Sequence, residues 1–378
     1  MQPHEPKPPA GGSILLFLCG DVMLGRGIDQ IMPHPGDPRL HERVVRSALQ
    51  YVRLAETANG AIPRAVAPDY VWGDALFELR RAQPQARIVN LETSITKSAG
   101  YLPKGINYRM SPDNIGVLTA AAIDCCVLAN NHVLDFGRDG LLETLDTLHG
   151  AGIATVGAGR TPAEAQAPAV IELPGGGRVL VFAFGHRSSG IPADWAAGAT
   201  RPGIDLLDDF SDRTLTGLAE RVRAQRRAGD ALIASLHWGG NWGYEIGNAE
   251  GNFARGLIDI GFDVVHGHSS HHPKAIEVYR DRLILYGCGD FLNDYEGISG
   301  YEEFRGDLSL MYLPRLCAAT GQLIDLRLVP FKIARFRLTR ADPADASWLQ
   351  QTLDAQSRAF GVRLTLTGDG ALSAGWLR

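Results

Sequence analysis

The sequence lacks a long hydrophobic run. Its first apolar stretch, "ILLFLC" at residues 14–19, follows the polar, proline-rich segment "MQPHEPKPPAGG". A membrane-spanning helix needs about 20 apolar residues, and a secretion signal needs a basic segment followed by about 7 to 15 apolar residues. We therefore predict a cytoplasmic protein without a membrane span, with a disordered tail over residues 1–12.

Cysteines are few, and basic residues are not in excess. The five cysteines are odd in number and include no C-x-x-C pair, which disfavours a disulfide framework or a zinc knuckle. With 37 Lys and Arg against 42 Asp and Glu, the net charge is −5, whereas nucleic-acid-binding proteins normally carry a basic face. A glycine-rich loop for phosphates is absent as well. We therefore expect no nucleic-acid partner.

Apolar runs that alternate with helical patterns are present instead. Strands that alternate with helices predict a layered α/β architecture. The clearest helix is "GLLETLDTLHGAGI" at residues 140–153, where leucines recur every three or four residues and glycine closes the segment. The runs that we interpret as strands are residues 14–19, 86–90, 122–128, 179–184, 231–236, 264–266 and 283–286.

Length indicates one large domain with additions. A chain of 378 residues exceeds the roughly 250 to 300 residues at which a single core stops growing. We expect a main domain at residues 13–335, with an insertion rich in Pro, Arg and Ala at about 32–68. Residues 336–378 are expected to form an appendage packed on the same domain. The pattern predicts antiparallel strands over residues 326–340 and a helix over residues 343–360.

Polar residues follow the predicted strands. After "ILLFLC" the chain continues "GDVMLGR", although Asn-Gly or Asp-Gly would turn it more readily. In open α/β sheets ligands bind at the carboxyl ends of strands, and buried carboxylates and imidazoles need partners. One such cluster occurs by chance, but five more in one chain indicate a site. These five are "NLETSIT", "LANNHVLDFG", "SLHWGGNWGYE", "VVHGHSSHHP" and "YGCGDFLND".

The motifs resemble a known family. "GDVMLGR", "NLETSIT", "ANNHVLDFG", "LHWG" and "GHSSHHP" are similar, in this order, to motifs of the CapA/PgsA-like poly-γ-glutamate biosynthesis family, a branch of the calcineurin-like metallophosphoesterases. The motifs extend from Gly20 to about Asn293, roughly three quarters of the chain. The resemblance implies a four-layer α/β/β/α metallophosphoesterase-like sandwich.

The resemblance also implies a metal centre. Carboxylate, amide and imidazole groups suit borderline divalent ions, and one or two ions (Mn, Zn, Fe or Ca) are expected as cofactors. His132 would be the acid beside the metal, with Asp135 as its orienting partner. His266 and His272 have no counterpart in the family pattern, and we expect them to be structural or to support the ligands. The implied ligands are Asp21, Glu92, Asn131, His237, His268 and His271.

Two departures from the family pattern bear on the chemistry. Calcineurin-like enzymes place Asp-x-His on the first strand, whereas Met23 stands in the histidine position here. Their second strand ends in Gly-Asp, whereas this one ends in Asn90, Leu91 and Glu92. One metal site is therefore expected to lack a ligand and Glu92 to be free to act as a base, which puts a two-metal phosphoester mechanism in doubt.

Three functions remain open at this point. The first is phosphoester hydrolysis, in which His132 protonates the leaving group. The second is L-to-D epimerisation at the α-carbon of a peptide, with Glu92 and a histidine such as His271 as the two bases. The third is a non-catalytic role in capsule or poly-γ-glutamate synthesis, for which a membrane anchor would be expected.

Aromatic residues near a predicted ligand favour the second function. Trp238, Trp242 and Tyr244 follow His237 closely, and flat apolar surfaces suit a peptide better than a bare phosphate. Arg26 is a further candidate for substrate binding. The alternative is that the aromatic residues simply cover the core. We therefore predict a peptide substrate and a metal-dependent epimerase similar to those of ribosomal lasso-peptide pathways.

Overall fold

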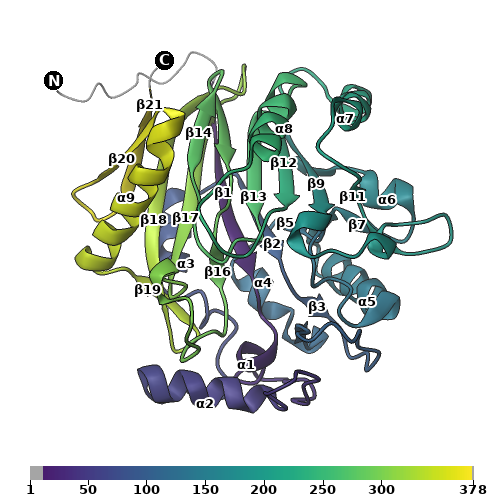
Figure 1. Cartoon of the computed structure of the whole chain (residues 1–378), viewed down its shortest axis with the longest axis vertical. Helices are drawn as coiled ribbons and strands as arrows, with labels where there is room; N and C mark the ends of the chain where they lie inside the picture. The colour runs from purple at the N-terminus through teal and green to yellow at the C-terminus, as the bar shows by residue number, and fades with distance from the viewer. Residues whose placement is uncertain (1–11, 377–378) are drawn as a thin grey trace.

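The computed structural model describes residues 12–376 and contains two large β-sheets that pack face to face (Figure 1). The first sheet contains β1 (Ser13–Val22), β2 (Ala86–Leu91), β5 (Cys125–Val127), β6 (Ala154–Val156), β16 (Asp290–Leu292), β17 (Leu308–Cys317), β18 (Leu323–Ala334), β19 (Arg337–Arg340), β20 (Val362–Leu366) and β21 (Leu372–Trp376). Its order is β20-β21-β18-β17-β1-β2-β5-β6, with β16 paired to β1 and β19 to β18. The strands β1, β2, β5 and β6 are parallel to one another.

The second sheet is mostly parallel. It contains β8 (Ala169–Glu172), β9 (Arg178–His186), β11 (Leu206–Leu207), β12 (Ala231–His237), β13 (Val264–His268), β14 (Ile276–Tyr279) and β15 (Arg282–Leu285). Its order is β11-β9-β12-β13-β15-β14, and β8 pairs with β9. Two small sheets pair β3 (Ser94–Ile95) with β4 (Arg109–Met110), and β7 (Ala158–Gly159) with β10 (Gly203–Ile204).

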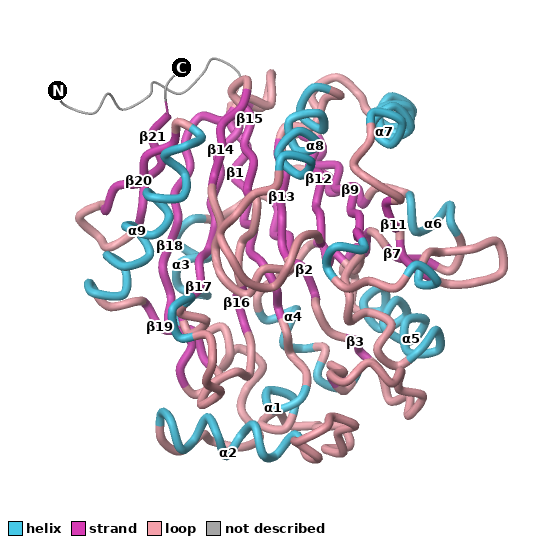
Figure 2. Tube along the Cα trace, in the orientation of Figure 1, coloured by secondary structure: helices cyan, strands magenta, loops and turns pink. Residues whose placement is uncertain are grey.

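Helices cover the outer faces of both sheets (Figure 2). Those against the first sheet are α3 (Asp74–Ala82), α4 (Gly116–Ala120) and α5 (Gly137–Gly150). The helices α1 (Arg26–Asp29) and α2 (Ala48–Asn59) contribute to the same core but lie at the edge where the strands end. Those against the second sheet are α7 (Asp212–Gln225) and α8 (Asn248–Asp259). The short α6 (Pro162–Gln166) contacts β7 and β10, and α9 (Pro343–Ser357) contacts β18 and β20. Over residues 12–376, no helix is long and apolar enough to cross a membrane.

Alternation along the strands creates three hydrophobic cores. In β1, Phe17 belongs to the core beneath α3, α4 and α5, whereas Leu18 belongs to the core between the sheets. In β9, Val181 belongs to the same middle core, whereas Phe182 packs beneath α7 and α8. Successive side chains of a strand point to opposite faces, so strands buried on both sides need a layer against each face. This arrangement confirms the predicted four-layer α/β/β/α sandwich.

The expected insertion at residues 32–68 and the expected C-terminal appendage at residues 336–378 both pack on the first sheet or its helices. Residues 32–68 contain α2, whose Val52 and Ala55 are buried in the first core. At the C-terminal end, β20 and β21 extend the first sheet, and α9 places Leu349 and Leu353 in the middle core. The predicted tail falls, apart from Gly12, outside the described residues.

The parallel strands of both sheets end at one edge of the sandwich. Within the first sheet, the register aligns Asp21 with Asn90 and with Asp290. Within the second sheet, it aligns His237 with His268. In Figure 1, α1 leaves β1 at this edge, and α2 lies beyond it. The polar motifs of the sequence are therefore brought together at the carboxyl ends of the strands.

Candidate metal centre

Asp21 lies where β1 is distorted. Between Cys19 and Asp21 the pairing of β1 with β2 shifts register, and the Asp21 N–H donates to the carbonyl oxygen of Gly289 at 3.0 Å. A Cβ atom on Gly20 would collide with the same carbonyl, so only glycine permits this close approach. The motif "GDVMLGR" therefore ends the strand with a buried carboxylate instead of a tight turn.

Asp21 belongs to two groups of three side chains that could each hold an ion. The first group is Asp21, His237 and His268, and the second is Asp21, His271 and Asp290. In each group the candidate ligand atoms all lie within 4.8 Å of one another. His237 Nδ1 lies 2.8 Å from His268 Nδ1. His271 Nδ1 lies 3.0 Å from Asp290 Oδ1. Asp21 is therefore common to both candidate metal sites.

Unpartnered carboxylate oxygens support a metal at this position. Asp21 Oδ2 and Glu92 Oε2 are buried, and neither has a hydrogen-bond partner among residues 12–376. Burial and the nearby charge of Asp290 raise the pKa of Asp21 to about 8. Burial, together with the charge of Asp21, raises the pKa of Glu92. A buried carboxylate stays ionised only where hydrogen bonds or a cation stabilise its charge, and these two oxygens lack hydrogen bonds, so both groups fit the presence of a divalent ion.

The histidines of the first group are in the form that binds metals. Burial lowers the pKa of His237 and of His268 well below the usual value for imidazole. Both rings are therefore neutral, and neutral imidazole is the metal-binding form. Nitrogen and carboxylate donors together suit ions such as Mn, Zn or Fe.

Beside these groups lies a second pair of polar residues, His132 and Asp135. His132 Nδ1 lies 2.6 Å from Asp135 Oδ2, and His132 Nε2 lies 3.9 Å from Glu92 Oε1. Lys104 also donates to Asp135, at 2.7 Å. Burial lowers the pKa of His132 to about 4, despite the opposing effect of Asp135. The imidazole is thus fixed by Asp135 at one nitrogen and faces Glu92 with the other.

Glu92 lies next to the groups of three but outside both, and the predicted amide ligand Asn131 lies beside His237. Glu92 Oε1 is 3.7 Å from His237 Nε2. Asn131 Oδ1 is 3.1 Å from the same nitrogen. The other four predicted ligands are members of one or both groups: Asp21, His237, His268 and His271.

Arg26 is buried among protein partners. It is 3% exposed, and all three nitrogens of its guanidinium donate hydrogen bonds to the protein. Nε donates to Asp294 at 3.2 Å, and NH1 donates to Glu42 and to Tyr51, each at 2.9 Å. These contacts favour a structural role for Arg26, and its predicted role in substrate binding stays a prediction. Arg26 ties α1 to α2 and to the loop after β16.

The three aromatic candidates separate into two environments. Trp238 is 4% exposed, and its Nε1 donates to the carbonyl oxygen of Tyr286 beneath α8. It covers the core, as the alternative interpretation of the aromatic residues expected, and its predicted contact with substrate stays untested. Trp242 lies 5.2 Å from His271 by ring centroids and stacks on Tyr301 at 4.0 Å. Tyr244 packs edge-on against the ring of His272 instead, with ring centroids 4.6 Å apart.

His266 and His272 lie outside both groups of three. His272 is buried, stacks on Phe304 with ring centroids 4.5 Å apart, and has Nδ1 3.2 Å from the carbonyl oxygen of Pro273. His266 Nε2 lies 2.8 Å from the carbonyl oxygen of Cys19 in the facing sheet. Both rings are therefore held by the fold behind the candidate ligands.

The sequence interpretation missed four residues of the centre. Asp290 supplies a carboxylate to the second group. Because Met23 replaces the histidine of the family pattern, one metal site was expected to lack a ligand. With Asp290, both groups have three candidate ligands. Asn90 donates to Asp21 Oδ1 at 2.6 Å. Tyr108 stacks on His132 at 3.9 Å, and its hydroxyl lies 2.6 Å from that of Tyr295. The signal for Asp290 was present in "YGCGDFLND", which stood among the polar strand ends.

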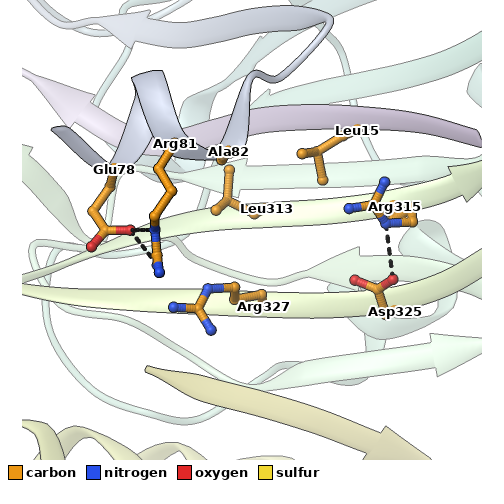
Figure 3. Close-up of a pocket in the computed structure, with 8 residues that line it drawn as sticks. All are labelled: Leu15, Glu78, Arg81, Ala82, Leu313, Arg315, Asp325 and Arg327. Atoms are coloured by element: carbon orange, nitrogen blue, oxygen red, sulfur yellow. Dashed lines mark hydrogen bonds and ion pairs between the residues drawn. The ribbon is translucent and has the colours of Figure 1, made fainter. Parts of the chain in front are cut away.

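A pocket of about 290 Å³ lies elsewhere, near the start of β1 (Figure 3). Two of its three arginines pair with acidic residues that also line it, and the third, Arg327, pairs with Asp369 at 2.6 Å. Arg81 pairs with Glu78 at 2.7 Å, and Arg315 pairs with Asp325 at 3.1 Å. The residues that line it are Leu15, Glu78, Arg81, Ala82, Leu313, Arg315, Asp325 and Arg327. The pocket contains none of the residues of the metal centre.

Comparison with known proteins agrees with the motifs. Residues 15–295 match the family described as "Bacterial capsule synthesis protein PGA_cap". A "Probable polyglutamine synthesis accessory protein" of Mycobacterium tuberculosis is 47% identical over 361 residues, which cover 95% of each chain. The "PGA biosynthesis protein CapA" of Bacillus subtilis is 24% identical, over 73% of this chain and 62% of that one. The 5'-nucleotidase precursor of Thermus thermophilus is 14% identical, with a TM-score of 0.45, over 92% of this chain and 59% of that one.

Proposed function

The chain belongs to the bacterial capsule synthesis protein PGA_cap family, and we propose that it is a metal-dependent hydrolase that acts on a peptide-like polymer of glutamate or glutamine. The observation that carries the proposal is that Asp21 belongs to both groups of candidate ligands and has one carboxylate oxygen without a hydrogen-bond partner among residues 12–376. The same site contains the hydrogen-bonded pair His132 and Asp135. This arrangement combines candidate metal ligands with a group that can move a proton. Both are needed to cleave an amide bond.

Five residues would hold the metal. A divalent ion would supply Lewis-acid polarisation of the substrate carbonyl. Asp21 would bridge the two positions, because it belongs to both groups of three. The remaining ligands would be His237 and His268 in one position, and His271 and Asp290 in the other.

His132 would carry the proton during cleavage. Because Asp135 Oδ2 accepts the hydrogen on His132 Nδ1, the lone pair of the ring is at Nε2. Nε2 can take the proton that the attacking water loses and return it to the leaving nitrogen of the amide. Asp135 keeps the ring in the tautomer that this transfer requires.

The expected substrate follows from the relatives and from the rim of the centre. The names of two relatives refer to polyglutamine synthesis and to PGA biosynthesis, which supports a polymer of glutamine or glutamate units. Trp242 and Tyr301 form a stacked pair beside His271, and Tyr301 is 50% exposed. Such a flat apolar surface suits the methylene and amide groups of a polymer better than a bare phosphate.

Epimerisation at the α-carbon is a second candidate, favoured by one observation. Glu92 lies in neither group of three, and its Oε2 has no partner among residues 12–376. A carboxylate that is not committed to a metal could remove the α-proton of a residue whose carbonyl is polarised. His132 Nε2 lies 3.9 Å from Glu92 Oε1 and is a second proton carrier that belongs to neither group of three.

One incubation distinguishes these reactions. The chain is loaded with Mn²⁺ and incubated in deuterated water with α-linked and γ-linked oligomers of glutamate and of glutamine. Mass spectrometry then measures shorter chains with new amino ends and, separately, deuterium at the α-carbon. A phosphate monoester is tested in parallel, and Asp21→Asn is the control for metal dependence.

The proposal expects new amino ends without deuterium at the α-carbon, and no cleavage by Asp21→Asn. Deuterium incorporation without cleavage would overturn hydrolysis and support the second candidate. Phosphate release with neither change in the oligomers would overturn both and support a phosphoesterase.

A further inference from the structure

A line of buried hydrogen bonds connects the two sheets behind the centre. Ser235 Oγ lies 3.1 Å from His266 Nδ1 and 2.9 Å from His268 Nε2. At one end of the line, His266 Nε2 lies 2.8 Å from the carbonyl oxygen of Cys19 in β1. At the other end, His268 Nδ1 lies 2.8 Å from His237 Nδ1. None of the residues of this line is assigned a role by the proposed function except the two ligands His237 and His268.

The line follows from strand register. The parallel pairing of β12 with β13 sets Ser235 opposite His266 and His237 opposite His268. Side chains two residues apart on a strand point to the same face. All four side chains therefore face the same side of the second sheet, toward β1, and Cys19 lies where the pairing of β1 with β2 shifts register.

The direction of the first bond is fixed by chemistry. A carbonyl oxygen can only accept, so His266 Nε2 must donate to Cys19. His266 is fully buried, and no carboxylate lies within ion-pair distance of it among residues 12–376. A buried imidazolium without such a partner is costly. His266 is therefore neutral, and its Nδ1 carries a lone pair.

The remaining directions follow in sequence. Ser235 has one hydrogen, and it must donate that hydrogen to the lone pair of His266 Nδ1. The Ser235 oxygen then accepts from His268 Nε2. Because Nε2 of His268 carries the hydrogen, its Nδ1 is left with the lone pair. Nδ1 is the atom that lies 3.9 Å from Asp21 Oδ1.

We infer that Ser235 and His266 are positioning residues, which hold His268 in the tautomer whose Nδ1 lone pair points at the metal centre. Groups that hydrogen-bond the non-ligating nitrogen of a metal-binding histidine fix the tautomer and the orientation of the ring. Here the fixed end of the line is a backbone carbonyl of the facing sheet, which cannot change its role. The inference rests on the proposed function, because it takes His268 as a metal ligand.

The first measurement reads the tautomer directly. Histidine is labelled with ¹⁵N in the metal-free chain, and long-range proton–nitrogen spectra identify which ring nitrogen carries hydrogen. Among the 11 histidines, the signals of His268 are those that His268→Gln removes. The expected result is a hydrogen on Nε2 in the wild type and a mixture of both tautomers in Ser235→Ala. A hydrogen on Nδ1 in the wild type would overturn the inference, whether or not the chain binds a metal.

The second measurement reads metal affinity by calorimetry with Mn²⁺ alone. Ser235→Ala should weaken binding about 10- to 100-fold, and Ser235→Thr, which keeps the hydroxyl, should restore most of it. Ser309→Ala is the matched control, because Ser309 is also a buried serine in a strand and its hydroxyl has no partner among residues 12–376.

The outcomes separate the inference from the proposed function. If the wild type binds Mn²⁺ and Ser235→Ala binds it equally well, the positioning role is wrong and the metal centre stands. If Ser235→Ala and Ser309→Ala weaken binding equally, the effect is one of packing and the inference is again overturned. If the wild type binds no divalent ion, the proposed function fails, and the tautomer spectra still decide the inference.

Discussion

At the scale of single residues, the two acidic side chains at the ends of β1 and β2 are placed for different tasks. Asp21 belongs to both groups of candidate ligands and receives a hydrogen bond from Asn90 at 2.6 Å. Glu92 belongs to neither group, although it lies 3.7 Å from His237. A ligand shared between two positions controls metal binding, whereas a free carboxylate nearby controls proton transfer.

This difference predicts opposite results for two substitutions that each remove one negative charge. Asp21→Asn should lower the affinity for Mn²⁺ by about 100-fold or more, because both positions lose a ligand. Glu92→Gln should still bind the metal, with a much smaller loss of affinity than Asp21→Asn, and lower the turnover rate by about 10²- to 10⁴-fold. Calorimetry and a turnover assay on the same preparations check both. Loss of the metal in Glu92→Gln would make Glu92 an ordinary ligand.

His132 should affect turnover without affecting the metal. Its Nδ1 is held by Asp135 at 2.6 Å, and it is a member of neither group of three. His132→Gln should therefore lower turnover by about 10²- to 10⁴-fold at unchanged affinity for Mn²⁺. His149→Gln, an exposed histidine on α5, is the control and should behave as the wild type. Undiminished turnover in His132→Gln would remove the residue from the mechanism.

The residues whose contacts sequence reasoning did not predict share a physical explanation. Trp238 directly follows His237, the last residue of β12, so its side chain faces the opposite side of the sheet from the ligand. Asp290 becomes a neighbour of Asp21 only because β16 pairs with β1 across a separation of more than 260 residues. Arg26 was expected at the centre because of its motif, but its partner Asp294 lies equally far along the chain. Local pattern identifies a strand end, and only the assembled sheet identifies its neighbours.

At the scale of elements, apolar runs and helical periodicity predicted the strands and helices well where the chain is regular. The expected helix at residues 140–153 corresponds to α5 (Gly137–Gly150), and the run at 86–90 corresponds to β2 (Ala86–Leu91). The run at 122–128 yields a strand only at Cys125–Val127. The reason is that Ala122, just after α4, has a φ of +49°, a left-handed conformation that interrupts an extended strand.

The connection between α1, α2 and the loop after β16 depends on one buried ion cluster. Arg26 pairs with Glu42 and Asp294, and all three side chains are at most 8% exposed. Removing one partner of a buried ion pair leaves an uncompensated charge. Arg26→Met should therefore lower the free energy of unfolding by about 3 to 5 kcal/mol, as measured by urea unfolding.

A matched variant tests the cause of that loss. If uncompensated charge is responsible, adding Glu42→Gln and Asp294→Asn to Arg26→Met should restore part of the stability. A loss below about 1 kcal/mol in Arg26→Met, the value of a surface ion pair, would contradict the prediction. So would a triple variant that is less stable than the single one.

At the scale of the whole molecule, one buried carboxyl outside the centre should shape the pH dependence of stability. Burial raises the pKa of Asp205 to about 6 from 3.8, although Arg221 opposes the effect. Between these values the folded chain binds more protons than the unfolded chain, so this group makes the free energy of unfolding fall as pH rises from about 4 to 6. The full difference corresponds to about 3 kcal/mol.

Asp205→Asn tests this effect, because asparagine cannot ionise and still offers an oxygen to Arg221, which donates to Asp205 Oδ2 at 2.6 Å. Urea unfolding between pH 4 and 7 should show a smaller fall in stability with pH for the variant than for the wild type. Identical slopes in the two proteins would contradict the raised pKa.

The metal centre should also contribute to the stability of the whole sandwich, because its ligands come from both sheets. Asp21 belongs to the first sheet, and His237 and His268 belong to the second. An ion held between them links the sheets in the folded state only, and binding to the folded state adds about 2.7 kcal/mol at a free concentration 100 times Kd. Scanning calorimetry should therefore show a Tm that rises by several degrees with added Mn²⁺ and falls again with EDTA.

Asp21→Asn should show no such rise, because it lacks the ligand common to both positions. If the Tm of the wild type is unchanged at concentrations where calorimetry shows the ion bound, the ion binds the unfolded chain equally well and does not join the two sheets.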